Sequence, residues 1–189
     1  MKAVAIPRHL HDVLGESQTV FELVAILAFG VGATVALALA CPEAMQGLPL
    51  WRSLPALALV LDIAAGCAAN FTRATNDFYA TRPRNRWIFI AVHGHVVVVA
   101  LLVGADLQAA VAVWLYTIAA AALVNALNAS RLQTFVAGLL LALGLGAIPV
   151  WPGLSPFMQV VAILFMLKVV FSFAVDHYRS AAPIEARRP

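Results

Sequence analysis

Four ionisable side chains lie inside long apolar segments, where they could do chemistry: Asp62, His93, His95 and Lys168. A charged group at the bilayer centre costs roughly 2.5–3.5 kcal/mol on insertion scales, so each is a candidate functional residue. At a helical rise of ~1.5 Å per residue, Asp62 and Lys168 lie about 15 Å and 20 Å from the arginine-poor ends of their segments. A lysine side chain spans that offset. We therefore expect a buried Asp62–Lys168 pair that shares a proton or releases one when a ligand binds.

A purely structural role is the alternative for both residues. Lys168 could extend alone toward the lipid headgroups, and Asp62 could form a hydrogen bond with a neighbouring helix. If Asp62→Asn and Lys168→Met leave stability and phenotype unchanged, the paired site is excluded.

The two histidines do not indicate a metal or haem site. Residues two apart on a helix point about 200° apart, so His93 and His95 cannot both ligate one ion, and at most one of them is expected to face the site. The other histidines, His9, His11 and His177, lie outside the apolar segments. We predict neither a metal nor another cofactor. His93 is placed at a depth close to that of Lys168 and is a candidate for proton transfer, with simple packing as its alternative.

A second polar group follows the segment that carries Asp62. Residues 70–86 mix amides, hydroxyls, one carboxylate and four arginines, and Asn125 is expected near the same level. Arginine forks match phosphate oxygens, and basic clusters beside a membrane attract anionic lipids. The candidate headgroup or phosphate residues are Arg73, Arg82, Arg84 and Arg86, which could instead only fix topology. The candidate binding residues are Asp62, Asn70, Asn76, Asp77, Tyr79, His93, Asn125 and Lys168.

The composition indicates which elements position these residues. Of the 189 residues, 63% are hydrophobic and 11% are charged, and the mean hydropathy is +0.92. Soluble domains average roughly 45–50% and 25%, so the chain is predicted to be an integral membrane protein. This composition excludes a disordered chain and gives no support for nucleic-acid binding.

Six apolar segments have about the length that crosses a ~30 Å hydrocarbon core. Each is expected to be an α-helix, because backbone polar groups in lipid must be satisfied within their own segment. The predicted fold is an all-α bundle of six transmembrane helices over residues 20–175. The expected spans are 20–41, 53–72, 87–104, 107–127, 132–151 and 156–175.

Lysine and arginine predict the orientation of this bundle. Ten of the twelve fall in segments that six spans place on one side, Arg52 falls on the other, and Lys168 is inside a span. Positive residues favour the cytoplasmic side, so both termini are expected to be cytoplasmic. A bacterial inner membrane fits this bias and the short loops.

The ends of the chain are expected to be cytoplasmic. Residues 1–19 form an N-terminal segment in which 7–19 are predicted to be a short amphipathic interfacial helix, and 176–189 form a tail. Cys41 and Cys67 have no spacing suited to zinc, and a disulfide is not expected.

Three function classes remain. The first is a multipass membrane protein whose cytoplasm-facing polar cavity binds or moves a small solute, an ion, a proton or a lipid. The second is an accessory or assembly subunit of a larger membrane complex. The third is a membrane-embedded enzyme that acts on lipid headgroups through Asp77, Tyr79 and the arginines. No catalytic signature is present, which favours a non-enzymatic role. The lipid bilayer is the expected partner, and stretches of small residues allow a homodimer or a complex partner.

Overall fold

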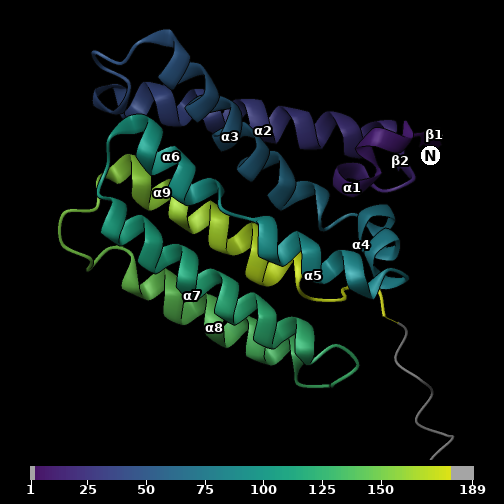
Figure 1. Cartoon of the computed structure of the whole chain (residues 1–189). Coiled ribbons are helices and arrows are strands. Elements are labelled where there is room, and N and C mark those ends of the chain that lie inside the picture. Colours follow the sequence, from purple (N-terminus) through teal and green to yellow (C-terminus); the bar gives the residue numbers. More distant parts are fainter. Residues whose placement is uncertain (1–2, 180–189) are drawn as a thin grey trace, which may run out of the picture.

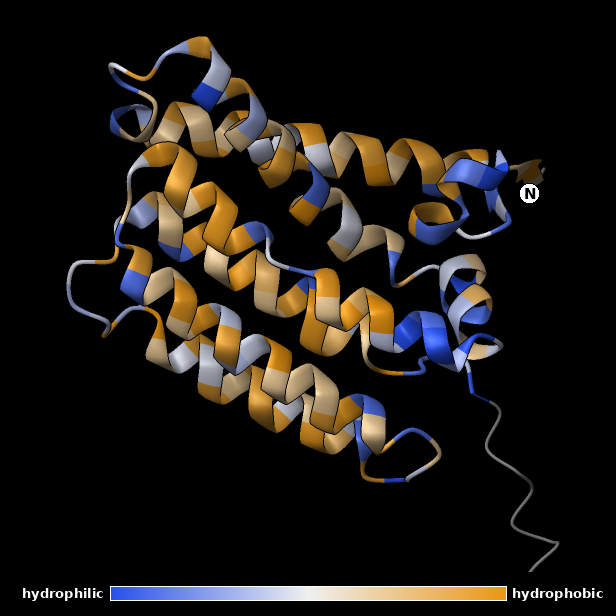
Figure 2. Cartoon of the chain, in the orientation of Figure 1, coloured by the Kyte–Doolittle hydropathy of each residue, from blue (hydrophilic) through white to orange (hydrophobic). Residues whose placement is uncertain are grey.

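The computed structural model describes residues 3–179 of the chain, and these are mostly helical (Figure 1). Lys2, Arg187, Arg188 and most of the predicted tail lie outside the described residues. The long helices run side by side in a bundle, and Figure 2 shows that apolar residues predominate along them. The protein is therefore an all-α protein with the surface expected of a membrane protein.

Five helical stretches are long and apolar enough to cross a membrane. They are α2 (Val20–Ala40), α3 (Leu50–Ala69), α5 (Pro83–Val92) with α6 (His95–Val103), α7 (Leu107–Ala126), and α9 (Pro156–Met166) with the π-helical segment η3 (Leu167–Phe173). The predicted fifth span contains α8 (Gln133–Ala147), whose 15 residues reach only about 22 Å at a rise of ~1.5 Å per residue. Of the six expected spans, five therefore meet the length criterion.

Capping residues explain where several of these helices begin. Thr19 accepts a hydrogen bond from the Glu22 backbone, and the Glu22 carboxylate bonds the Thr19 backbone in return, which starts α2. The Asp106 carboxylate accepts the backbone N–H groups of Gln108 and Ala109 at the start of α7. Ser155 caps α9, whose first residue is a proline.

The central element of the bundle is the α9–η3 stretch, which is the most buried of the five. It packs against α3, α6, α7 and α8, whereas α2 lies at the edge and packs mainly on α3. Both ends of the described chain lie at the same end of the bundle (Figure 1). We call this the basic end, because α4, the start of α5 and the turn between α7 and α8 lie there (Figure 1), and Arg73, Arg82, Arg84 and Arg131 belong to these segments or directly adjoin them.

The N-terminal segment differs from the predicted interfacial helix. Only η1 (Arg8–Leu10) and α1 (His11–Leu14) are helical, and they lie between β1 (Ala3–Ala5) and β2 (Ser17–Thr19), which pair in antiparallel register. Gly15 (φ +70°) ends α1 close against the backbone of Ala74. The buried Gln18 side chain donates to Thr72 Oγ1 at 2.8 Å. The segment is thus docked on the turn between α3 and α4 (Arg73–Ala80).

The predicted span 87–104 is also different, because it is not one continuous helix. It begins earlier, at Pro83, and breaks between α5 and α6 at His93 and Gly94. The break leaves the His93 carbonyl outside the helical ladder, and Trp114 Nε1 of α7 donates to this oxygen at 2.9 Å. A side chain thus supplies the hydrogen bond that the break removes.

Candidate functional site

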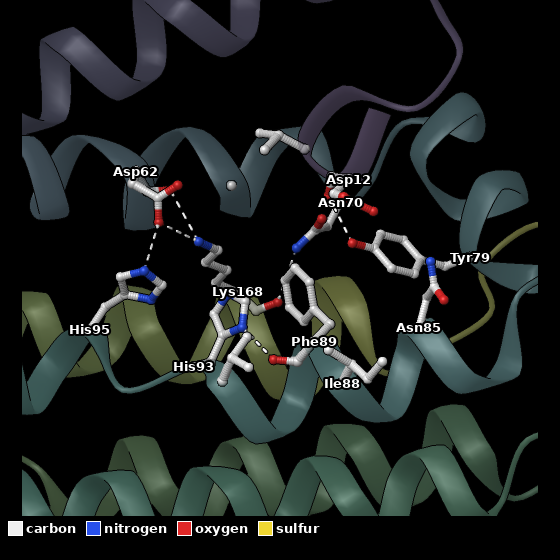
Figure 3. Close-up of a pocket in the computed structure, with 13 residues that line it drawn as sticks. Asp12, Asp62, Asn70, Tyr79, Asn85, Ile88, Phe89, His93, His95 and Lys168 are labelled. Atoms are coloured by element: carbon white, nitrogen blue, oxygen red, sulfur yellow. Dashed lines mark hydrogen bonds and ion pairs between the residues drawn. The ribbon is translucent and has the colours of Figure 1, made fainter. Parts of the chain in front are cut away.

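A cavity of about 360 Å³ lies between α3 and α5 and runs from the middle of the bundle toward the basic end (Figure 3). Asp62, Lys168 and His95 lie at its inner end, and Asp12, Tyr79 and Asn85 lie at its outer end. The remaining lining residues are Val13, Gly66, Asn70, Ile88, Phe89, Val92 and His93. Five of the eight candidate binding residues predicted from the sequence line this cavity: Asp62, Asn70, Tyr79, His93 and Lys168.

The predicted contact between Asp62 and Lys168 is present. Lys168 Nζ donates to Asp62 Oδ2 at 2.7 Å and to the Asp62 carbonyl oxygen at 3.3 Å. The two side chains differ in exposure, since Asp62 is 39% exposed and Lys168 only 5%. The carboxylate therefore faces the cavity, and the ammonium group lies behind it.

Gly66 makes room for the lysine. A Cβ atom at this position would overlap Lys168 Cε and would lie 2.9 Å from Nζ. Gly66 is one helical turn after Asp62 on α3, so the lysine chain crosses α3 at the glycine and ends on the carboxylate. Gly66 was not among the residues predicted for the site.

The two histidines occupy the same cavity, which corrects the expectation that they point in opposite directions. His95 Nε2 lies 3.6 Å from Asp62 Oδ2, and the rings of His93 and His95 are 4.9 Å apart. The 200° angle holds for a continuous helix, and the break at His93 and Gly94 removes that condition. His95 thus belongs to the site, although it was not among the predicted binding residues.

His93 is held by its surroundings more firmly than His95. It is buried, its ring stacks on Phe89 with centroids 3.7 Å apart, and its Nδ1 contacts the Phe89 carbonyl. Among the described residues, the buried Nδ1 of His95 has no hydrogen-bond partner. The His95 side chain is 25% exposed, so its ring is more accessible from the cavity than that of His93.

Polar groups nearer the basic end mostly bind the backbone. Asn70 Nδ2 approaches the Lys168 carbonyl at 3.5 Å, and the Tyr79 hydroxyl donates to the Asp12 carbonyl at 2.8 Å. Burial raises the pKa of Tyr79, so this hydroxyl stays protonated and remains a donor at neutral pH. These contacts join α1 to the wall of the cavity.

The other predicted binding residues lie outside this cavity. Asn76 Nδ2 donates to Asp176 Oδ1 at 2.9 Å, and the His177 backbone N–H donates to Asn76 Oδ1 at 3.1 Å. Asp77 is exposed and lies 3.6 Å from Arg73. Asn125 Oδ1 accepts from Arg86 Nε at 2.8 Å. Asn76 and Asn125 thus fasten elements together near the basic end.

The four arginines proposed for a headgroup or phosphate do not form one cluster. Arg86 is 2% exposed and also donates to the Ala174 carbonyl at 2.8 Å. Arg82 bonds Glu16 at 2.8 Å and lies over the Phe78 ring. Arg73 and Arg84 are at the surface. The buried Arg86 was missed as a structural residue, although its polar neighbours Asn125 and Gln133 in apolar helices were a signal for such a network.

Among residues 3–179, no group of three or more His, Cys, Asp and Glu side chains is arranged to hold a metal ion. Cys41 and Cys67 are both buried free thiols. No family model, no curated protein and no solved structure matches the chain.

Proposed function

We propose that this chain is a multipass membrane protein that binds, and in its working cycle moves, a small solute in the cavity between α3 and α5. In this proposal α8 is the sixth span, and the bundle lies in a bacterial inner membrane with both termini and the basic end cytoplasmic. Positive residues favour the cytoplasmic side of such membranes. The cavity is then entered from the cytoplasm.

The observation that carries this proposal is the exposure of Asp62 beside a shielded Lys168. A purely structural ion pair in an apolar environment is stable when both partners have their hydrogen bonds satisfied and neither faces a cavity. Here the carboxylate is 39% exposed, and no donor within residues 3–179 reaches its Oδ1. An accessible carboxylate oxygen between helices of a membrane protein is what a polar solute would bind.

The cavity itself has the character of a small-molecule site. Its volume lies within the roughly 300–1,000 Å³ that is typical of such pockets. Val13 of α1 and Ile88, Phe89 and Val92 of α5 form an apolar part of the wall, and eight of the thirteen lining residues carry polar side chains. This combination gives affinity through burial and orientation through the polar groups.

Native mass spectrometry of the protein in lipid nanodiscs tests the proposal. We expect the wild-type chain to carry a bound small molecule, and Asp62→Asn to lose it. Glu43→Gln is the matched control, because it also replaces a carboxylate with an amide but lies in the exposed turn η2 (Pro42–Ala44) between α2 and α3. A chain that carries no small molecule but a constant protein partner would overturn the proposal in favour of an accessory subunit.

A further inference from the structure

We propose that the ligand of this cavity is an amphipathic organic cation, whose ammonium group binds Asp62 Oδ1 and whose apolar body lies against α5. The inference rests on the proposed function above and adds the chemical class of the ligand. It follows from which charges face the cavity, from the character of its walls and from its size.

The charges that a ligand meets are mainly negative. Asp12 and Asp62 line the two ends of the cavity, and Lys168 is the one lysine or arginine among the described lining residues. The Lys168 side chain is 5% exposed, and its ammonium already donates to the Oδ2 and carbonyl oxygen of Asp62. An incoming anion would therefore meet the carboxylate before the ammonium. A cation would meet Oδ1 directly, with the geometry of a charge-assisted hydrogen bond.

The side chains around Asp62 leave its Oδ1 atom free to bind a cation. His95 Nε2 is 3.6 Å from Oδ2, on the same carboxylate oxygen that Lys168 binds. Both contacts, which Figure 3 marks at the inner end of the cavity, use Oδ2, and Oδ1 is thus left for the ligand. His93 faces the same end, but its Nδ1 contacts the Phe89 carbonyl. Asp12 adds a second carboxylate where the ligand would enter.

The walls fit an apolar body rather than a bare ion. Ile88 and Val92 of α5 are exposed by 49% and 67%, and with Phe89 and Val13 they form an apolar surface along the cavity. Burial of a methylene group contributes about 0.8 kcal/mol to binding. A bare metal ion would leave most of the 360 Å³ unfilled, and the described residues hold no cluster of ligands for one. A molecule with one ammonium and an apolar chain fills both parts of the cavity.

A pair of probes of the same size and opposite charge tests this inference. The full chain in nanodiscs of zwitterionic lipid is titrated with 4-phenylbutylammonium and with 4-phenylbutyrate, and empty nanodiscs give the blank for partitioning into lipid. We expect the ammonium to bind at least about tenfold more tightly, because its contact with Asp62 is charge-assisted. Equal affinities, tighter binding of the carboxylate, or no binding of either probe would overturn the inference.

Substitutions inside and outside the cavity test whether the probes bind there. Asp62→Asn should abolish the preference for the ammonium probe, and Glu43→Gln should keep it. Because Asp62→Asn leaves Lys168 buried without a charged partner and could fail to fold, Asn85→Asp is the second variant. Asn85 lines the outer end of the cavity, and an added carboxylate there should strengthen binding of the ammonium several-fold and weaken binding of the carboxylate. Unchanged affinities in Asn85→Asp contradict the inference.

The result also separates this inference from the proposed function. If 4-phenylbutyrate binds more tightly and Asn85→Asp weakens that binding, the cavity is a ligand site and only the cation is wrong. If neither probe binds and native mass spectrometry finds no small molecule, both proposals fail.

Discussion

Gly66 is the residue on which the geometry of the Asp62–Lys168 pair depends most directly. An alanine Cβ there would overlap Lys168 Cε, and the nearly enclosed lysine has little room to move away. We expect Gly66→Ala to lower the free energy of unfolding by about 1–3 kcal/mol, as overpacked cores do. Thermal unfolding in detergent measures this.

Gly32→Ala is the control for that change. A Cβ at Gly32 meets nothing within 4 Å, and the residue lies in the helical interior of α2. Its substitution should be neutral or stabilise the protein by up to about 1 kcal/mol, since alanine is the better helix former. Equal destabilisation by both substitutions would show that Lys168 does not cross α3 at Gly66.

The two partners of the ion pair should respond differently to substitution. Asp62→Asn leaves the ammonium of a nearly enclosed Lys168 without a charged partner, which costs roughly 3–5 kcal/mol for buried pairs. Lys168→Met leaves a carboxylate that is 39% exposed to the cavity and can be hydrated, so its cost should be smaller. The double variant should recover much of the loss caused by Asp62→Asn. The free energies of unfolding of the three variants give the comparison. If Lys168→Met lost more unfolding free energy than Asp62→Asn, this would contradict the exposures of the two side chains.

Part of this site could be predicted from single residues, and part could not. The Asp62–Lys168 contact follows from depth alone, because the helical rise is regular and a lysine chain is long. His95 was left out of the predicted binding residues because the direction of its side chain was calculated for an unbroken helix. Gly66 gave no signal, since a glycine among other small residues, here Ala65 and Cys67, is common in the helices of membrane proteins.

At the level of elements, the break between α5 and α6 makes the site, and Trp114 stabilises the break. Trp114 Nε1 donates to the His93 carbonyl oxygen, which accepts no helical backbone hydrogen bond because the helix is interrupted there. Trp114→Phe keeps the ring but removes the donor, so the free energy of unfolding should fall by about 1–3 kcal/mol. It should also move His93 and His95 relative to Asp62 and weaken ligand binding.

Trp87→Phe provides the matched control. Trp87 lies on α5, is 47% exposed, and its indole donates no hydrogen bond among the described residues. Its substitution should change stability by less than about 0.5 kcal/mol, as is usual for surface positions. Similar losses in the two variants would contradict the proposed role of Trp114.

Helix existence could be predicted at this scale, whereas breaks and short elements could not. The lengths of the apolar segments predicted the long helices, because a helix that crosses the hydrocarbon core needs about 20 apolar residues. The break at His93 and Gly94 depends on a donor from α7, a tertiary contact that local sequence does not contain. The pairing of β1 with β2 likewise depends on docking of Gly15 and Gln18 against α3 and α4.

For the whole molecule, the distribution of charge and polarity fits one direction of access. The basic end carries the outer end of the cavity, the N-terminal segment and the arginines of α4 and α5. At the opposite end, Arg52 donates to the Leu101 and Leu102 carbonyls at 2.9 Å and 2.7 Å. Arg52 thus binds backbone carbonyl groups in the last turn of α6 and does not line the cavity. The sequence indicated this polarity through its arginine bias, and five helical stretches of the described residues are long and apolar enough to cross a membrane.

Chemical labelling of the inner end of the cavity tests the central claim most directly. His95→Cys places a thiol beside Asp62, and the wild-type chain gives the background because Cys41 and Cys67 are buried. We expect a membrane-impermeant thiol reagent to label His95→Cys in inside-out vesicles and to leave it unlabelled in right-side-out vesicles. Prior addition of the ammonium probe should slow the labelling. Labelling only from the outside, or from neither side, would contradict a cytoplasm-facing cavity at Asp62.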